Sequence, residues 1–234
     1  MLTAEVCCIV PAAGVGKRMQ TDIPKQYLPF RSVTILEHTL SRLLSCPFIK
    51  KIILVISKDD VYWPLSSYYG DSRVIQVEGG AERADSVFNG LVMAEELFGK
   101  ESWALVHDAA RPCVMASDVE RLANKSASTH QGSILAAPIH DTIKQTLSTG
   151  SIKTLDRTTL WRALTPQLFQ INALKNALIN AKQQGKLVTD EASAIEMNGG
   201  VVELVEGRTD NIKVTTLSDL SLANYFVEQQ EKVL

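Results

Sequence analysis

A loop with two glycines and several cations follows an apolar segment near the start of the chain. The apolar segment, Val6 to Val10, is typical of a buried strand, and the loop follows it as Pro11-Ala12-Ala13-Gly14-Val15-Gly16-Lys17-Arg18-Met19. Glycine lets backbone N–H groups approach phosphate oxygens, and Lys17, Arg18 and the nearby Lys25 supply positive charge. The pattern favours a polyphosphate site, although a sharp turn with solvated cations explains two glycines equally well.

Two common phosphate loops do not fit this spacing. In a Walker A loop four residues separate a first glycine from Gly-Lys-[Ser/Thr], but Pro11 stands at that position before Gly16-Lys17, and Arg18 follows the lysine. A dinucleotide fingerprint needs glycine where Met19 stands and an acidic residue at the end of the second strand, where Ser57-Lys58 stands. An NAD-dependent dehydrogenase is therefore disfavoured.

A second pair of glycines, Gly79-Gly80, ends another expected strand, and Arg83-x-x-Ser86 opens a helix after it. Glycines let a flat ligand approach the backbone, whose N–H and C=O groups can read a base edge together with one hydroxyl. An ordinary strand-to-helix turn also explains this segment.

A carboxylate follows the apolar strand that ends at Val106, in His107-Asp108-Ala109-Ala110-Arg111. At a strand end Asp108 faces the ligand crevice, where one carboxylate, phosphates and water suffice to hold Mg²⁺. His107 fits a hydrogen-bonded structural histidine at least as well as a proton shuttle.

Two later polar segments also carry candidate groups. Thr165 stands in Leu164-Thr165-Pro166-Gln167, and Thr189-Asp190 is able to cap the helix that follows it, so both segments also read as loop and helix-cap chemistry. A solvated turn accounts for Arg208 and Asp210. Lys213 lies between Ile212 and Val214, so its ammonium must be directed at a partner.

Short strand-like runs alternate with helical patterns along much of the chain. This alternation predicts an α/β fold with a doubly wound, mostly parallel sheet flanked by helices, with ligands at the carboxyl ends of the strands. The expected strands are Val6–Val10, Lys51–Ile56, Arg73–Val77, Trp103–Val106, Ser133–Ala137 and Val201–Val205, and two apolar helical stripes run over 35–44 and 87–98.

The segment from Asp141 to Arg157 reads as two strands around Ser-Thr-Gly-Ser, so we expect a projecting β-hairpin arm over 138–159. A lone hairpin is only marginally stable in water, so we expect the arm to pack on a second copy of the chain. The alternative is that the hairpin folds back on its own domain. Further on, Asn172 is expected to cap a helix. Thr216-x-x-Asp219 resembles a capping box before a last helix that we expect to close on the sheet.

The whole chain, 1–234, is expected to form one domain. A net charge of −2 argues against a general nucleic-acid binder. No apolar run approaches the roughly 20 residues of a membrane span, and Met1 to Glu5 lacks a basic signal-peptide start. These features predict a cytoplasmic protein that does not bind membranes. The cysteines, Cys7, Cys8, Cys46 and Cys113, show no Cys-x-x-Cys spacing and are expected to be buried thiols.

The first loop, Ala-Ala-Gly-x-Gly-x-Arg-Met before Pro-Lys-Gln, resembles the signature of nucleotidyltransferases that activate sugar or polyol phosphates. Together with the other four segments, it resembles the 2-C-methyl-D-erythritol 4-phosphate cytidylyltransferase family from about Val6 to Phe226. The resemblance implies a nucleotidyltransferase-type sheet, a homodimer, and cytidylyl transfer from CTP to methylerythritol phosphate with release of pyrophosphate, a step of non-mevalonate isoprenoid synthesis.

The resemblance also implies roles for individual residues. The CTP-binding residues would be Ala12, Ala13, Gly14, Gly16, Gly80, Ser86 and Thr165. The catalytic cations would be Arg18, Lys25, Arg157 and Lys213. Asp108 would hold Mg²⁺. The acceptor would be bound by Thr189 and Asp210, together with Thr142 and Arg157 from the arm of the other subunit.

One departure from the family pattern is Ala81, where some relatives carry a polar residue, so a side-chain contact to cytosine is missing. Two alternatives remain open. A ribitol-5-phosphate cytidylyltransferase would share the fold, the CTP site and the arm, whereas a catalytically silent nucleotide-binding protein would not need cations on the acceptor side.

Overall fold

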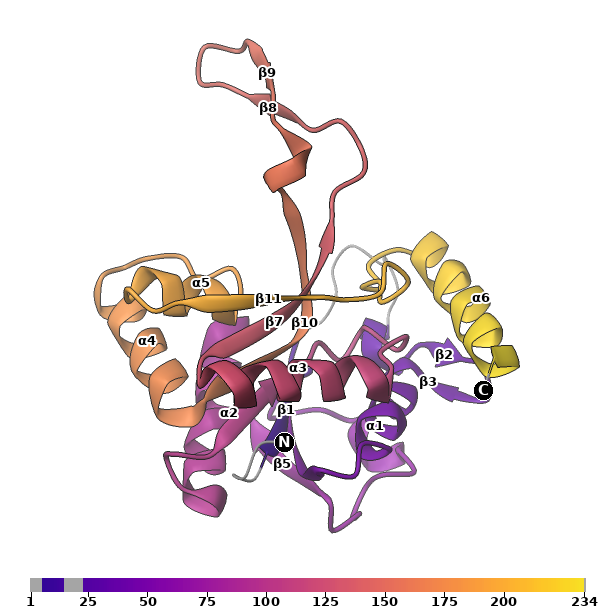
Figure 1. Cartoon of the computed structure of the whole chain (residues 1–234). Coiled ribbons are helices and arrows are strands. Elements are labelled where there is room, and N and C mark those ends of the chain that lie inside the picture. The colour runs from indigo at the N-terminus through magenta and orange to yellow at the C-terminus, as the bar shows by residue number, and fades with distance from the viewer. Residues whose placement is uncertain (1–5, 15–22, 234) are drawn as a thin grey trace.

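The centre of the protein is a seven-stranded sheet in the order β11-β7-β10-β6-β1-β4-β5 (Figure 1). The computed structural model describes residues 6–14 and 23–233. Only β10 runs antiparallel to its neighbours in this sheet, so the predicted mostly parallel, doubly wound architecture is confirmed. The strands are β1 (Val6–Pro11), β4 (Ile49–Ile56), β5 (Val74–Glu78), β6 (Trp103–Val106), β7 (Gly132–Pro138), β10 (Trp161–Gln170) and β11 (Val202–Glu206).

Helices cover both faces of this sheet, which explains why its central strands β1 and β6 are continuously apolar. Along β1, Cys8 and Val10 pack on one face while Cys7 and Ile9 pack on the other, because alternate side chains point to opposite sides. The first face is covered by α1 (Ile35–Leu44) and α3 (Ala116–Thr129). The second is covered by α2 (Arg83–Phe98), α4 (Ile171–Gln183) and α5 (Glu191–Met197).

Strand β10 was not expected, because the segment around Thr165 was interpreted as loop and helix-cap chemistry. A bulge interrupts its pattern: Ala163 pairs with Ala136 and Gln167 with Ile134, so β10 places three residues where β7 places one. Bulges re-aim side chains and often lie beside active sites. Here the bulge contains Thr165 and brings it to the carboxyl end of β6.

The hairpin arm is confirmed as a projecting element (Figure 1). Its strands β8 (Lys144–Thr146) and β9 (Ile152–Thr154) pair only with each other among the described strands, and all of their residues are exposed. The 3₁₀ helix η4 (Arg157–Thr159) leads back into β10. The dimer that the arm suggests stays a prediction.

Two expectations about the last third of the chain were wrong. Helix α4 begins directly after β10 with Gln170 at its N-cap and no side-chain cap, so Asn172 lies inside the first turn. The last helix, α6 (Leu217–Val233), does not close on the main sheet. It packs through Ala223 and Val227 on Phe30, beside the small sheet of β2 (Pro29–Phe30) and β3 (Val33–Thr34).

The predicted capping box before the last helix and the predicted buried cysteines were confirmed. The Thr216 amide donates to Asp219 at 2.9 Å and the Asp219 amide donates to the Thr216 hydroxyl at 3.2 Å, which is the capping box before α6. All four cysteines are buried and free. Across residues 6–14 and 23–233, none of the helices is long and apolar enough to span a membrane.

We expect Gly90→Ala to destabilise the protein by about 1–3 kcal/mol, because a Cβ there would lie 2.6 Å from Cγ2 of Ile9. Replacing glycine with alanine inside a helix usually increases the free energy of unfolding by about 1 kcal/mol. A decrease here would therefore distinguish the close contact with Ile9 from the usual helix effect. Urea unfolding measures it, with the exposed Glu96→Ala on the same helix as control. A Gly90→Ala protein at least as stable as wild type would contradict the tight packing of α2 on β1.

Candidate active site

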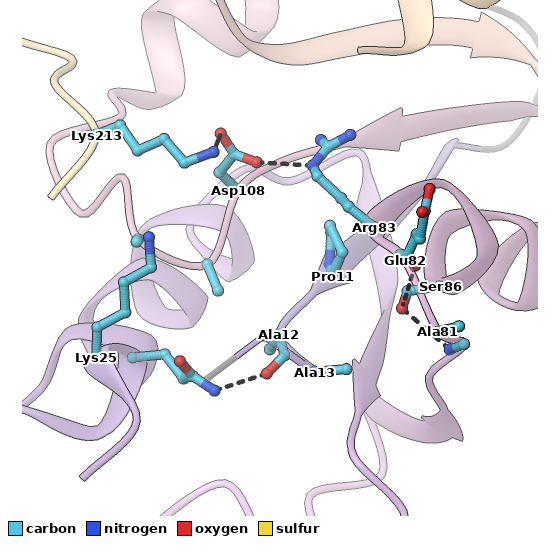
Figure 2. Close-up of a pocket in the computed structure, with 15 residues that line it drawn as sticks. Pro11, Ala12, Ala13, Lys25, Ala81, Glu82, Arg83, Ser86, Asp108 and Lys213 are labelled. Carbon is cyan, nitrogen blue, oxygen red and sulfur yellow. Dashed lines mark hydrogen bonds and ion pairs between the residues drawn. The ribbon is translucent and has the colours of Figure 1, made fainter. Parts of the chain in front are cut away.

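Two cavities meet at the carboxyl ends of β1 and β6, where the strand order reverses: the chain continues from β1 to β4 and from β6 toward β7, in opposite directions along the sheet. The first has a volume of about 190 Å³ and the second about 290 Å³. Three residues, Arg83, Asp108 and Lys213, line both. These three side chains form a wall between the cavities, and Figure 2 shows them from the side of the first.

The first cavity is bounded on one side by the segment that leaves β1. The Ala12 amide donates to the Val55 carbonyl at 2.7 Å, and Gln26 Nε2 donates to the Ala12 carbonyl at 2.7 Å (Figure 2). Gln26 belongs to the 3₁₀ helix η2 (Lys25–Tyr27), whose Lys25 also lines the cavity and donates to the Val214 carbonyl at 3.3 Å. The hydrogen bond from η2 to the Ala12 carbonyl therefore fixes the position of Lys25 relative to the Ala12 segment.

The opposite side of the first cavity is the turn between β5 and α2. A Cβ on Gly79 would lie 2.5 Å from that of Ala13, and one on Gly80 would lie 2.3 Å from Cβ of Asp85. Only glycine permits these approaches. The Ser86 hydroxyl accepts from the Gly80 amide at 3.1 Å and donates to the Glu82 carbonyl at 3.2 Å, so it shapes this turn.

Asp108 is surrounded by three cations. Its carboxylate contacts Nε of Arg83 at 3.2 Å, Nε of Arg111 at 3.2 Å and Nζ of Lys213 at 3.0 Å. Burial alone would raise the pKa of Asp108, but the charges of Arg83, Lys213 and Arg111 outweigh burial and hold that pKa well below its usual range. Asp108 is therefore ionised at any physiological pH.

Arg83 is held in turn by Glu191, the first residue of α5. Its Nη1 and Nη2 atoms contact the two Glu191 oxygens at 2.6 and 3.2 Å. Burial would lower the pKa of Arg83, but the charges of Glu191 and Asp108 more than offset burial and raise it. Sequence analysis missed this pair, because an arginine and a glutamate at helix starts look like solvated surface residues.

The second cavity lies between β10 and the start of α5, and is lined by Thr165, Gln167, Thr189 and Asp190 as well as the wall. Gln167 Nε2 donates to Asp190 at 2.9 Å, while its Oε1 accepts from the Ala192 amide at 2.9 Å. Asp190 accepts from the Ser193 amide at 2.9 Å, which confirms its predicted role as an N-cap. These bonds attach the start of α5 to β10.

His107 is completely buried, and it contacts Thr165, which lines the second cavity. Its Nε2 lies 3.1 Å from the Arg111 carbonyl, which only accepts, so Nε2 carries the proton. Its Nδ1 then accepts from the Thr165 hydroxyl at 3.0 Å, and that hydroxyl accepts from the Asp108 amide at 3.1 Å. His107 is thus a structural residue that orients Thr165, as one of the two sequence interpretations held.

The structure brings together most of the site residues predicted from sequence. The residues that line at least one of the two cavities are Ala12, Ala13, Gly14, Lys25, Gly80, Ser86, Asp108, Thr165, Thr189 and Lys213. Gly16 and Arg18 lie outside the described residues.

Three predicted acceptor residues line neither cavity of their own chain. Asp210 contacts Arg208 at 2.6 Å and accepts from Gln230 at 3.2 Å. Thr142 and Arg157 are exposed on the arm, where Arg157 Nη1 donates to the carbonyl of His140. Their assignments stay predictions.

The described residues contain no cluster of three or more His, Cys, Asp or Glu side chains that could hold a metal ion. Asp108 nevertheless fits Mg²⁺ as a single protein ligand. Its Oδ1 accepts one contact, from Arg83, and an ionised carboxylate oxygen has capacity for about two. Mg²⁺ commonly completes its shell with substrate phosphates and water.

The model of the 2-C-methyl-D-erythritol 4-phosphate cytidylyltransferase family matches residues 6–229. A curated relative of that name from Photobacterium profundum is 47% identical over 236 residues, covering 99% of this chain and 100% of its own. One from Haemophilus influenzae (strain 86-028NP) is 48% identical over 231 residues, covering 98% and 100%. The crystal structure of the Francisella tularensis protein of the same name has a TM-score of 0.83 at 38% identity, covering 95% of this chain and 100% of that one.

The buried His107 predicts how stability depends on pH. Burial lowers the pKa of His107 from 6.5 to about 4, so between these values the unfolded chain binds more protons than the folded protein. Stability contributed by the neutral ring is complete above pH 6.5 and falls by about 3 kcal/mol as the pH drops to 4.

Nitrogen-detected NMR is the direct measurement. The His107 ring should remain the neutral Nε2–H form from about pH 8 to about pH 5.5 in the folded protein and titrate near its ordinary pKa in urea. A folded His107 that protonates within that range would contradict the assigned hydrogen bonds.

Proposed function

This chain belongs to the 2-C-methyl-D-erythritol 4-phosphate cytidylyltransferase family, and from that premise we propose how its residues divide the reaction. The enzyme transfers a cytidylyl group from CTP to 2-C-methyl-D-erythritol 4-phosphate in isoprenoid synthesis. An acceptor phosphate oxygen bonds to the α-phosphorus of CTP, the bond to the bridging oxygen of the β-phosphate breaks, and pyrophosphate leaves with that electron pair. The nucleophile is already anionic, so the difficulty is to bring two anions together.

We assign the first cavity to CTP. The slot between the Ala12 segment and the Gly80 turn suits a flat base, because its walls expose backbone groups and its glycines allow close approach. Ala81 presents only a methyl group here, so cytosine is read by the backbone and Ser86. Lys25 lies across the cavity from Ala81 and Ser86 in Figure 2, and we assign its ammonium to the triphosphate.

The single observation that carries the assignment of the transfer step is the wall of Arg83, Asp108 and Lys213 between the cavities. A reaction that joins two phosphates needs a cation at the point where they meet. Lys213 lines both cavities and is the cation that we assign to the α-phosphate as it becomes five-coordinate. Lys25 and Arg18 are assigned to the leaving phosphates.

We propose Mg²⁺ as the cofactor, and Asp108 is the residue that would hold it. A metal ion held there would supply positive charge that offsets the negative charge of the reacting phosphates. The three cations around Asp108 keep the carboxylate ionised, which is the form that binds a metal ion. His107 and Thr165 hold the backbone of Asp108 in place, so the carboxylate does not reorganise during the reaction.

We propose that the second cavity, with Thr189, binds the acceptor, and that a second copy of the chain completes it. Thr142 and Arg157 belong to the arm that projects from the main sheet in Figure 1, and they line neither cavity of their own chain. In a two-fold symmetric homodimer built through the arm, 138–159, these residues would reach the acceptor in the partner's site. The planar guanidinium of Arg157 suits a phosphate group. Asp210 remains a proposed acceptor contact.

Because CTP is an intracellular nucleotide, we place the activity in the cytoplasm.

Pyrophosphate release tests the acceptor. The protein should release pyrophosphate from CTP and Mg²⁺ with 2-C-methyl-D-erythritol 4-phosphate and stay near background with ribitol 5-phosphate, because the acceptor cavity recognises the whole polyol. Release with ribitol 5-phosphate alone would favour the rival transferase. Release with neither acceptor would favour a nucleotide-binding protein without catalytic activity.

Subunit mixing tests whether the arm crosses to the partner. Arg157→Ala and Lys213→Ala should each lower kcat by about 10²–10³. If Arg157 serves the partner's site, a mixed dimer of the two variants holds one intact site. After subunit exchange the mixture should then recover about a quarter of wild-type activity, because about half of the symmetric dimers are mixed.

The control is a mixture of Lys25→Ala with Lys213→Ala, whose residues line the same cavity of one chain. This mixture should recover nothing, because every site lacks one of the two lysines. An Arg157→Ala and Lys213→Ala mixture that also recovers nothing, despite proven exchange, would show that the arm does not complete the partner's site.

A further inference from the structure

A line of alternating charges runs through the wall between the cavities. Glu191 contacts Arg83 through both carboxylate oxygens, at 2.6 and 3.2 Å, and Arg83 reaches Asp108 through Nε at 3.2 Å. Asp108 then contacts Lys213 at 3.0 Å. Arg83, Asp108 and Lys213 line the cavities, whereas Glu191 lies behind them and lines neither.

Helix stability alone does not account for the burial of Glu191, because an acidic residue in the first turn of a helix gains only about 0.3–1 kcal/mol. Its side chain is only 2% exposed, and burying a carboxylate costs several kcal/mol unless it is paired. Helix α5 is already capped by Asp190, so Glu191 is not needed for capping. All of its side-chain contacts with hydrogen-bond geometry, among the described residues, are with Arg83.

The geometry of the Arg83 guanidinium shows what this contact achieves. Two of its nitrogens are engaged by Glu191, which leaves Nε to contact Asp108. A bidentate contact fixes the plane of the guanidinium as well as its position. Without it, Arg83 would be free to turn its two terminal nitrogens onto Asp108 and to compete there with Lys213.

We propose that Glu191, acting through Arg83, is a positioning residue for the cytidylyl transfer. It holds the guanidinium so that Asp108 and Lys213 stay aligned at the junction where the two phosphates react. This inference rests on the proposed function, because the junction is where that function places the reacting phosphates. Misalignment of a charged group lowers the rate of the chemical step more than it lowers substrate binding.

Glu191→Gln and Arg83→Lys test the proposal. Glutamine removes the negative charge of Glu191, and lysine lacks the two terminal nitrogens with which Arg83 contacts Glu191. Each should lower kcat by about 10–100-fold and change KM for CTP and for the acceptor by less than about threefold. The double variant should lose little more than the worse single variant, because both changes break one line of contacts.

The matched control is Glu95→Gln, which breaks the ion pair between Glu95 of α2 and Lys175 of α4, away from both cavities. It should leave kcat unchanged. All proteins are compared below their measured unfolding temperatures, so that lost stability does not count as lost rate.

Two results would overturn the proposal. One is a folded Glu191→Gln enzyme with the wild-type kcat, and the other is a loss that lies entirely in KM for CTP, which would make Arg83 a binding residue. The wild-type protein, assayed beside the variants, must release pyrophosphate with the acceptor. Its failure would reject the proposed function and is distinguishable from a negative result in the variants alone.

Discussion

The ionised, buried carboxylate of Asp108 is the constraint on which the site depends. A buried charge without partners would be strongly destabilising, so cations must converge on it from separate parts of the chain. Arg83 comes from the start of α2, Arg111 from the turn after β6, and Lys213 from the segment after β11. Satisfying one carboxylate therefore fixes three segments relative to one another, and they are the segments that separate the two cavities.

The parts of the site that were predictable from sequence are those that follow an apolar strand. The Ala12 segment, Gly80 and Asp108 each do so, and parallel strands bring their carboxyl ends to one edge of the sheet. Lys213 was recognisable for another reason. It lies between the apolar residues Ile212 and Val214, so its ammonium was expected to contact a partner. Local sequence patterns were sufficient to predict these residues, because the carboxyl ends of parallel strands lie at the same edge of a sheet.

The remaining features depend on contacts between distant segments. Strand β10 has polar residues and a proline at its bulge, so it lacks the alternation that identifies a strand. Arg83 and Glu191 lie 108 positions apart, and neither residue type shows from its neighbours that it is buried. Asn172 looked like a cap because no pattern showed that α4 follows β10 without a break.

The bulge in β10 has a consequence for how this protein can change during evolution. It separates the register of the Trp161–Ala163 end, which leads to the arm, from that of the Gln167–Gln170 end, which pairs with β6. Insertions or deletions near the hairpin tip can then be absorbed in the exposed loop without shifting Thr165. A change of length at the tip is therefore compatible with an unchanged sheet edge, provided that Thr142 and Arg157, outside the β8–β9 hairpin, keep their places on the arm.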